Sequence, residues 1–453
     1  MKQIYLVAAT LSFAVITDLP ARAQNVLLDQ DAQTREQLPL DQDAQTLEQL
    51  WNGLSKAGVN LSLVLINESA GNPIGGVSQG TTDAGQLQLG ADFNLEKILG
   101  IPGASVHVTE FKDYGESLSL DNLGTGFKSQ EIFKNAFTNW HFGLLTYEQR
   151  LLYNRIDIAL GRTATSQYFA HSPFACDFMS GTNCGMPEIV QSESGFSLLP
   201  SATWGGKISF QVTPQLYVMT GVFEVNSFIA HTSGFDFSTQ HASGVTVPVE
   251  IGYTTTFETD AYPYEVKLGG YYSDGGHADP LFNTKGRLLG TFGGTAATIQ
   301  DRSGMYLLAD KTLWRAGLQS FRNVAVFGGW ALPFDKTEVY DNQVYAGVVW
   351  TGPFASRPGD TIGFVGNYFH VSSQESEFLN DARIKAGGGG VGSQNEGTLE
   401  IDYGANVLPS VRVTPDIQYI INPDNSSIPN VKFVPRNALV IGLQISLHFG
   451  SRA

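Results

Sequence analysis

The sequence predicts an all-β fold, a transmembrane antiparallel up-and-down β-barrel of about sixteen strands with a short N-terminal helical or linker extension. Three observations predict it: hydrophobicity alternates with period two along most of the chain, the intervals between candidate strands run long then short, and the composition is unusual. Of 453 residues, 50 are glycine and 11% are aromatic, while only 15% are charged. Soluble domains carry roughly 25% charged residues, so this bias favours a β protein rich in turns.

Composition also excludes other classes of protein. A helical membrane protein needs several apolar runs of about 20 residues, and the single candidate run lies at the N-terminus and is shorter. Nucleic acid is excluded as a partner because the net charge of -16 leaves no basic excess to neutralise phosphates.

Residues 1-23 have the pattern of a secretory signal peptide. Lys2 precedes an apolar run, Ile4–Ile16, and Ala21-Arg22-Ala23 is the small-x-small pattern that signal peptidase recognises. Cleavage is therefore predicted before Gln24. The alternative, an uncleaved anchor helix, needs a longer apolar run.

Residues 24-56 form a predicted periplasmic extension that contains a tandem duplication. Leu28–Leu38 returns almost unchanged as Leu40–Leu50, with Pro39 at the junction. Two copies do not make a solenoid. The segment is either a helical extension that pairs with another copy or with a peptidoglycan-side partner, or a duplicated linker tolerated at a terminus.

Residues 57-449 are the predicted barrel and residues 450-453 a C-terminal tail. The C-terminal run shows the alternation most clearly, because one face is apolar and the other holds Gly442, Gln444, Ser446 and His448. The apolar face consists of Leu439, Ile441, Leu443, Ile445, Leu447 and Phe449. The same pattern recurs near 87–93, 156–160, 245–253 and 399–407. The apolar set is expected to face lipid, and the polar set to line a water-filled lumen without a packed core.

A soluble sandwich also alternates, but the connections favour a porin. Long intervals lie near 67–84, 112–140, 163–205, 226–247, 274–302, 332–341, 372–396 and 422–436. Short ones lie near 94–102, 153–154, 214–215, 258–263, 316–321, 353–359 and 409–410. Porins have short periplasmic turns and longer extracellular loops, and this order places both chain ends in the periplasm.

Several segments resemble the carbohydrate-selective porins of the OprB type. The most specific are Pro415-Asp-Ile-Gln-Tyr-Ile-Ile-Asn-Pro423 and Asn437-Ala-Leu-Val-Ile-Gly-Leu443, and the resemblance runs from about Trp51 to Phe449. It implies a sixteen-stranded barrel of a Gram-negative outer membrane that passes mono- or oligosaccharides by diffusion. The sequence departs from the family's pattern at two places. The family usually opens with a Trp-Gly-Gly-like stretch, whereas here Trp51-Asn-Gly53 follows the duplication. Outer-membrane barrels commonly end on an aromatic residue, whereas here Gly450-Ser-Arg-Ala453 follow Phe449.

The interval 163–205 is the candidate constriction loop, because the third long loop of a porin commonly folds into the lumen. Cys176 and Cys184 are expected to close a disulfide in an oxidising compartment, the alternative being two free thiols. Aromatic faces stack on sugar rings, so an aromatic constriction favours saccharides over ions. The alternative is that these rings only pack loops against one another, which explains their presence equally well. The candidate rings are Tyr168, Phe169, Phe174 and Phe178.

Charged residues on two neighbouring strands are the pore-lining candidates. The alternation places Glu148 and Arg150 on one lumen face, and Arg155 and Asp157 on the next. Opposed charges can hydrogen-bond sugar hydroxyls. The alternative is a solvated wall of paired charges.

No catalytic residue, metal site or cofactor is predicted. Gly76-Val-Ser-Gln-Gly80 matches the nucleophile-elbow pattern but lacks the strand-turn-helix context. A passive sugar channel is the leading function. The alternatives are a general diffusion pore, an outer-membrane enzyme, or a plugged structural or adhesive barrel. Predicted partners besides sugars are outer-membrane lipid and lipopolysaccharide, the barrel insertion machinery and, as a homo-oligomer, other copies of the chain.

Overall fold

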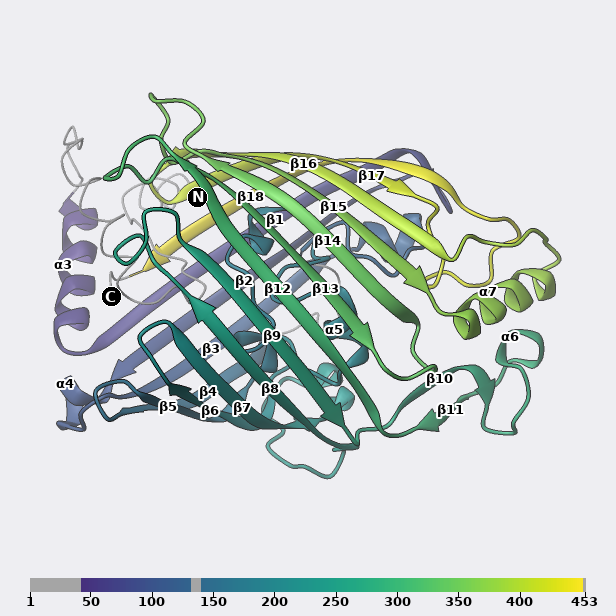
Figure 1. The fold of residues 1–453 in the computed structure, drawn as a ribbon, viewed down its shortest axis with the longest axis horizontal. Coiled ribbons are helices and arrows are strands. Elements are labelled where there is room, and N and C mark those ends of the chain that lie inside the picture. Colours follow the sequence, from purple (N-terminus) through teal and green to yellow (C-terminus); the bar gives the residue numbers. More distant parts are fainter. Residues whose placement is uncertain (1–41, 132–139, 451–453) are drawn as a thin grey trace.

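The structure, a computed structural model, describes residues 42–131 and 140–450. Its main feature is a closed barrel of sixteen antiparallel strands (Figure 1). The predicted signal peptide and the first copy of the duplication lie outside the described residues. Among the residues described, no helix is long and apolar enough to span a bilayer.

Each barrel strand pairs with its neighbours along the chain, and β1 closes the barrel on β18. The strands are β1 (Val59–Gly76), β2 (Thr81–Asn94), β3 (Ala104–Gly115), β4 (Trp140–Leu151), β5 (Ile156–Thr163), β6 (Thr203–Gln211), β7 (Leu216–Val225), β8 (Gly244–Thr254), β9 (Tyr264–Ser273), β12 (Arg302–Arg315), β13 (Asn323–Pro333), β14 (Tyr340–Thr351), β15 (Thr361–Val371), β16 (Asn395–Leu408), β17 (Val411–Ile421) and β18 (Arg436–Gly450). The closing pair is in register over most of its length, with Leu63 opposite Phe449 and Ser69 opposite Leu443.

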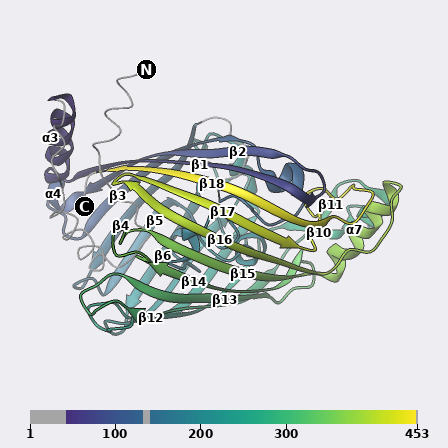
Figure 2. The ribbon, with the colours of Figure 1, turned by 90° about the horizontal axis from the view of Figure 1, so that it is seen from above.

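The two ends of the barrel differ. One end carries the start of β1 and the end of β18 and is here called the turn end. Its connections include short ones at 152–155, 212–215 and 409–410. Helices α3 (Gln42–Lys56) and α4 (Leu95–Leu99) lie at this end (Figures 1 and 2). Its opposite, the loop end, carries the strands β10 (His277–Asn283) and β11 (Ala296–Ile299) and the helices α6 (Leu289–Phe292) and α7 (Ser373–Lys385).

Side-chain exposure follows the alternation of the sequence. On β18, Ile441 and Leu443 are 52% and 39% exposed on the outer face, whereas Gln444 on the inner face is 8% exposed. Ile401 on β16 is likewise exposed, and its neighbours Glu400 and Asp402 are buried. Because a bilayer covers the outer face of such a barrel, the exposed apolar set is the lipid contact.

The interval 67–84 is not a long loop, contrary to the sequence prediction. β1 and β2 continue through it, pair as far as Gly71 opposite Thr81, and leave only 77–80 as the connection. The outer-face residues of this continuation are polar, so the alternation of apolar and polar residues does not reveal it. They satisfy one another, because Asn67 Nδ2 and Ser69 Oγ donate to the Asp83 carboxylate at 2.9 and 2.6 Å.

The inner wall is also less uniformly polar than predicted. Phe223, Phe327, Val365 and Phe369 are buried on the inner face of β7, β13 and β15, and they cluster with hydrophobic residues of the loop 164–202. These loop residues are Phe169, Ala170, Phe178, Met186, Ile189, Val190 and Phe196. The loop therefore lies inside the barrel and packs against one side of it. Helix α5 (Glu188–Glu193) of this loop lies against β12, β13 and β14 (Figure 1). Burial of each such aromatic side chain contributes about 1.5–3 kcal/mol.

The outer-face assignment predicts a difference between two arginine substitutions. Leu443→Arg on the lipid face should destabilise the barrel and reduce its free energy of unfolding in vesicles by about 2–4 kcal/mol. Gln88→Arg, on the opposite face of β2, should change it far less because water fills the lumen. Denaturant titration of both variants in phospholipid vesicles measures the difference, and equal costs would reverse the assignment of the two faces.

Candidate functional site

The loop 164–202, here called the constriction loop, lies inside the barrel and packs against its wall. It leaves β5 and returns to β6, and it contains short 3-10 turns at Thr165–Gln167 and Ala175–Asp177. Its hydrophobic residues are buried against the wall of β7 to β15, as described above. Residues 168–177 are here called the tip of the loop, and Tyr168, His171, Phe174 and Asp177 within it are half-buried.

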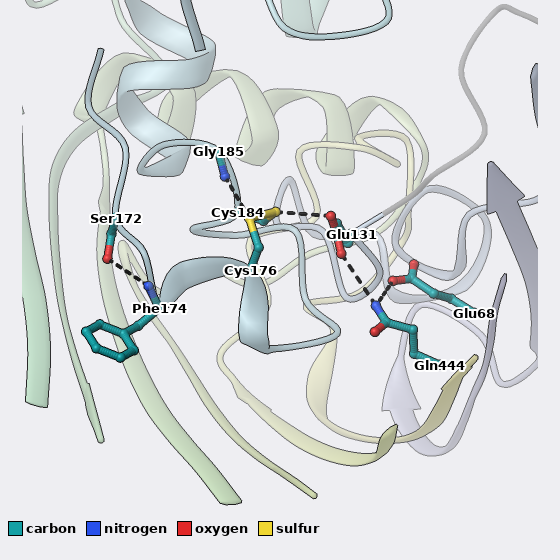
Figure 3. Close-up of a disulfide and its surroundings, with 8 residues drawn as sticks. All are labelled: Glu68, Glu131, Ser172, Phe174, Cys176, Cys184, Gly185 and Gln444. Atoms are coloured by element: carbon teal, nitrogen blue, oxygen red, sulfur yellow. Dashed lines mark hydrogen bonds between the residues drawn. A yellow bond between two sulfur atoms is a disulfide. The ribbon is translucent and has the colours of Figure 1, made fainter. Parts of the chain in front are cut away.

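A disulfide joins Cys176 to Cys184 in this loop, with 4.4 Å between the two Cα atoms (Figure 3). The Gly185 N–H donates to Cys176 Sγ at 3.2 Å. On the other side, Glu131 Oε1 lies 3.1 Å from Cys184 Sγ. The disulfide thus closes the short segment that carries Asp177 and Phe178, and a residue of the preceding long loop braces it.

Glu131 links the disulfide to the barrel wall. Gln444 Nε2 on β18 donates to Glu68 Oε1 on β1 at 2.8 Å and to Glu131 Oε2 at 3.4 Å (Figure 3). Burial raises the pKa of Glu131 to about 7. Because a disulfide sulfur carries no proton, the carboxyl group has to be the donor in the contact with Cys184, and it can donate only while protonated.

The described residues offer little for a metal ion. The one group of three possible donor atoms within 4.8 Å of one another is Glu131, Cys176 and Cys184. The two sulfur atoms are bonded to each other, so they are not the thiolates that bind metals.

The four aromatic candidates of the constriction loop separate into two pairs. Phe169 is fully buried and meets Phe223 edge-on at 6.0 Å, and Phe178 is 2% exposed and lies 5.8 Å from Phe327. Both rings hold the loop on the wall, which is the packing role left open above. Tyr168 and Phe174 are only half-buried.

Tyr168 and Phe174 are held by different contacts. Lys207 Nζ on β6 lies 5.3 Å from the centre of the Tyr168 ring, a cation–π distance, and the Tyr168 hydroxyl is 3.0 Å from Thr163 Oγ1. The Phe174 ring stacks on Phe327 at 5.9 Å.

Three of the four charged candidates lie on β4 and β5 near the turn end, and each forms an ion pair. Arg150 Nε donates to Glu148 Oε1 at 2.8 Å, and His107 Nε2 is 3.5 Å from Glu148 Oε2. Asp157 pairs with Lys207. Arg155, however, lies in the turn 152–155 and is exposed, because β4 ends at Leu151 and β5 begins only at Ile156.

Sequence reasoning missed three basic residues of the inner wall. Lys207 and Lys267 lie on β6 and β9, where the alternation is irregular, and each pairs with an acid, Asp157 and Glu265 respectively. Arg412 on β17 donates to Asn406 and to Thr361. Arg412 is opposite Asn406 and Ser446, which was an available signal. Lys207 is opposite Ala159 and Gly221, and Lys267 is opposite Gly252 and Leu308, so their neighbours gave none.

His171, in the tip of the constriction loop, is neutral at physiological pH. Burial lowers its pKa to about 4, and the nearby Lys267 ammonium group acts in the same direction. His171 therefore adds no charge to this part of the loop.

Comparisons with known proteins agree on one family. The model of the family described as "Carbohydrate-selective porin, OprB family" matches residues 78–449. The chain is 27% identical to Porin B of Pseudomonas aeruginosa over 421 residues, covering 88% of this chain and 90% of that protein. It is similar to the high-pH structure of OprB from Pseudomonas putida, with a TM-score of 0.78, 27% identity and coverage of 88% of this chain and 96% of that chain.

The raised pKa of Glu131 predicts a pH dependence of the constriction. The brace on Cys184 should be at full strength below pH 4.5, the ordinary pKa of a glutamate, and should be lost as the pH rises to about 7. The open-channel current noise of single channels should increase over this range. Glu131→Gln cannot ionise, so its noise should stay constant between pH 4 and pH 8 (approximately the titration window); a wild-type noise level that does not change with pH would contradict the assignment.

Proposed function

This chain belongs to the OprB family of carbohydrate-selective porins, and on that basis we propose how its lumen selects sugars. The protein is an outer-membrane porin of a Gram-negative bacterium through which sugars diffuse. The observation that carries the proposed mechanism is a loop folded inside a closed barrel, with half-buried rings at its tip beside acid–base pairs of the wall. The constriction between this tip and the wall is the proposed site of selection.

The paired charges suit a polar but uncharged solute. Asp157 with Lys207, and Glu148 with Arg150, each present an acceptor and a donor close together. A sugar hydroxyl both donates and accepts, so it can bridge such a pair, whereas an ion is attracted by one partner and repelled by the other. The two pairs therefore favour sugars over ions of similar size.

Tyr168 and Phe174 supply the apolar part of the proposed contact. One face of a pyranose ring is lined with C–H groups and covers an aromatic ring well. Because each contact is weak and several follow one another along the lumen, a solute can enter and also leave. We infer that selection operates through many weak contacts and not through one tight site.

The ends of the barrel fit its place in the outer membrane. Porins turn their short connections to the periplasm and their long loops outward, so the turn end with α3 is assigned to the periplasm. The lipid-facing strand ends carry exposed aromatic side chains, including Trp140 and Trp204 near the loop end. These rings are proposed to contact the outer leaflet, as aromatic girdles of barrels do.

Liposome swelling tests the proposed function. Vesicles that contain the purified protein should swell faster in isotonic glucose or a disaccharide than in an anionic solute of equal size. Vesicles without the protein set the background rate. Equal rates for sugar and anion would leave a general diffusion pore, and no swelling would indicate a plugged barrel.

Removing the two half-buried rings tests the aromatic contribution. Tyr168→Ala and Phe174→Ala should each weaken the block of single-channel current by a disaccharide about three- to tenfold, the effect of losing roughly 0.5–1.5 kcal/mol of ring stacking. Tyr153→Ala, at a fully exposed position in the turn 152–155, is the matched control and should leave the block unchanged. If Tyr153→Ala weakened the block as much, the effect would not belong to the constriction.

A further inference from the structure

Ala170, in the constriction loop, has a backbone conformation that requires support. Its φ angle is +59°, in the left-handed region that residues other than glycine adopt only at a cost. Its side chain is fully buried, and in the sequence it stands between Tyr168 and Phe174, whose rings are half-buried. Whatever holds Ala170 therefore also determines where these two rings point.

Glu250 on β8 is one support. Its carboxylate is 1% exposed and accepts three hydrogen bonds: from the Ala170 N–H at 2.9 Å, from the Tyr217 hydroxyl at 2.7 Å and from the Tyr306 hydroxyl at 2.7 Å. A buried carboxylate is stable only when donors replace its water, and here one of the donors belongs to the loop.

Lys267 on β9 is the second support. Its ammonium group donates to the carbonyl oxygen of His171 at 2.8 Å and pairs with Glu265 Oε1 at 2.6 Å. In the pairing of β8 with β9, Gly252 is opposite Lys267 and Gly269 is opposite Glu250. Glu250 and Lys267 are therefore diagonal neighbours on the inner wall.

The two charges match the polarity of the backbone that they hold. The acid binds the N–H of Ala170, and the base binds the C=O of the next residue, His171. Exchanging the two charges would place each against a group of the same sign. The arrangement is thus specific for one orientation of the loop backbone.

We propose that Glu250 and Lys267 form a charged clasp that positions the tip of the constriction loop and thereby sets the sugar selectivity of the pore. Both are positioning residues, because they act through Ala170 and His171 and not by binding the sugar. The link to sugar selectivity rests on the proposed function. The link to loop position stands on the hydrogen bonds alone.

The test is single-channel recording with the purified full-length mature protein and a disaccharide as blocker. Glu250→Ala leaves the Ala170 N–H without its acceptor, so the single open level should split into several interconverting levels, and the block should weaken about tenfold, the value of one hydrogen bond to a charged group. Glu250→Gln keeps an acceptor oxygen in place and should restore a single level, with block within about threefold of wild type.

Two further variants separate the clasp from general damage. Glu224→Ala removes a buried wall carboxylate that accepts from Trp204 N and Asn226, neither of which lies in the constriction loop, and it should behave like wild type. Combining Glu250→Ala with Ala170→Gly removes the strain at residue 170 and should reduce the number of open levels. If Glu250→Ala does not fold, Lys267→Met carries the same test through the His171 contact.

Either of two results would overturn the proposal. One is a single open level with wild-type block in Glu250→Ala or, if that variant does not fold, in Lys267→Met. The other is the same splitting in Glu224→Ala. A wild-type channel that sugars do not block would refute the proposed function instead, and the number of open levels would still decide whether the clasp positions the loop.

Discussion

The structure depends on one constraint: a backbone that crosses lipid must satisfy its own hydrogen bonds. Pairing of β1 with β18 meets this constraint, because it leaves no strand edge in the membrane. Closure has two further consequences. It creates an interior that lipid does not reach, and it forces side chains to alternate between that interior and the bilayer.

The constriction loop turns this interior into a selective path. It enters the barrel because the inner wall from β7 to β15 offers apolar partners such as Phe223 and Phe327. The disulfide, the Glu131 brace and the clasp at Ala170 then limit its movement at separate points. We propose that solutes pass between the loop tip and a wall of paired charges, which suits a neutral, hydroxyl-rich solute.

Much of the fold could be predicted from the sequence, because alternation in lipid-facing strands is a physical requirement. The alternation predicts that Ile441, Leu443, Ile445, Leu399 and Ile401 face the lipid, and all five are exposed on the outer face. The ends of the strands were harder to predict from the sequence. β1 and β2 continue through polar residues that satisfy one another, and β5 begins just after Arg155.

The candidate site was predictable only in part. The loop, its two cysteines and the phase of Glu148 and Asp157 follow from local sequence. Which aromatic ring is fully buried and which stays half-buried depends on distant partners, as Phe178 on Phe327 and Tyr168 on Lys207 show. Glu250 gave no signal, because its role comes from a contact with Ala170, eighty residues away in the sequence.

Titration of single-channel conductance with glucose, a disaccharide and a small amino acid measures whether the constriction loop selects sugars. We predict open steps whose current falls with sugar concentration and is insensitive to the amino acid, because only the sugars offer both a ring face and hydroxyl groups to the constriction. Open steps that none of the three solutes reduces would contradict selection at the constriction loop.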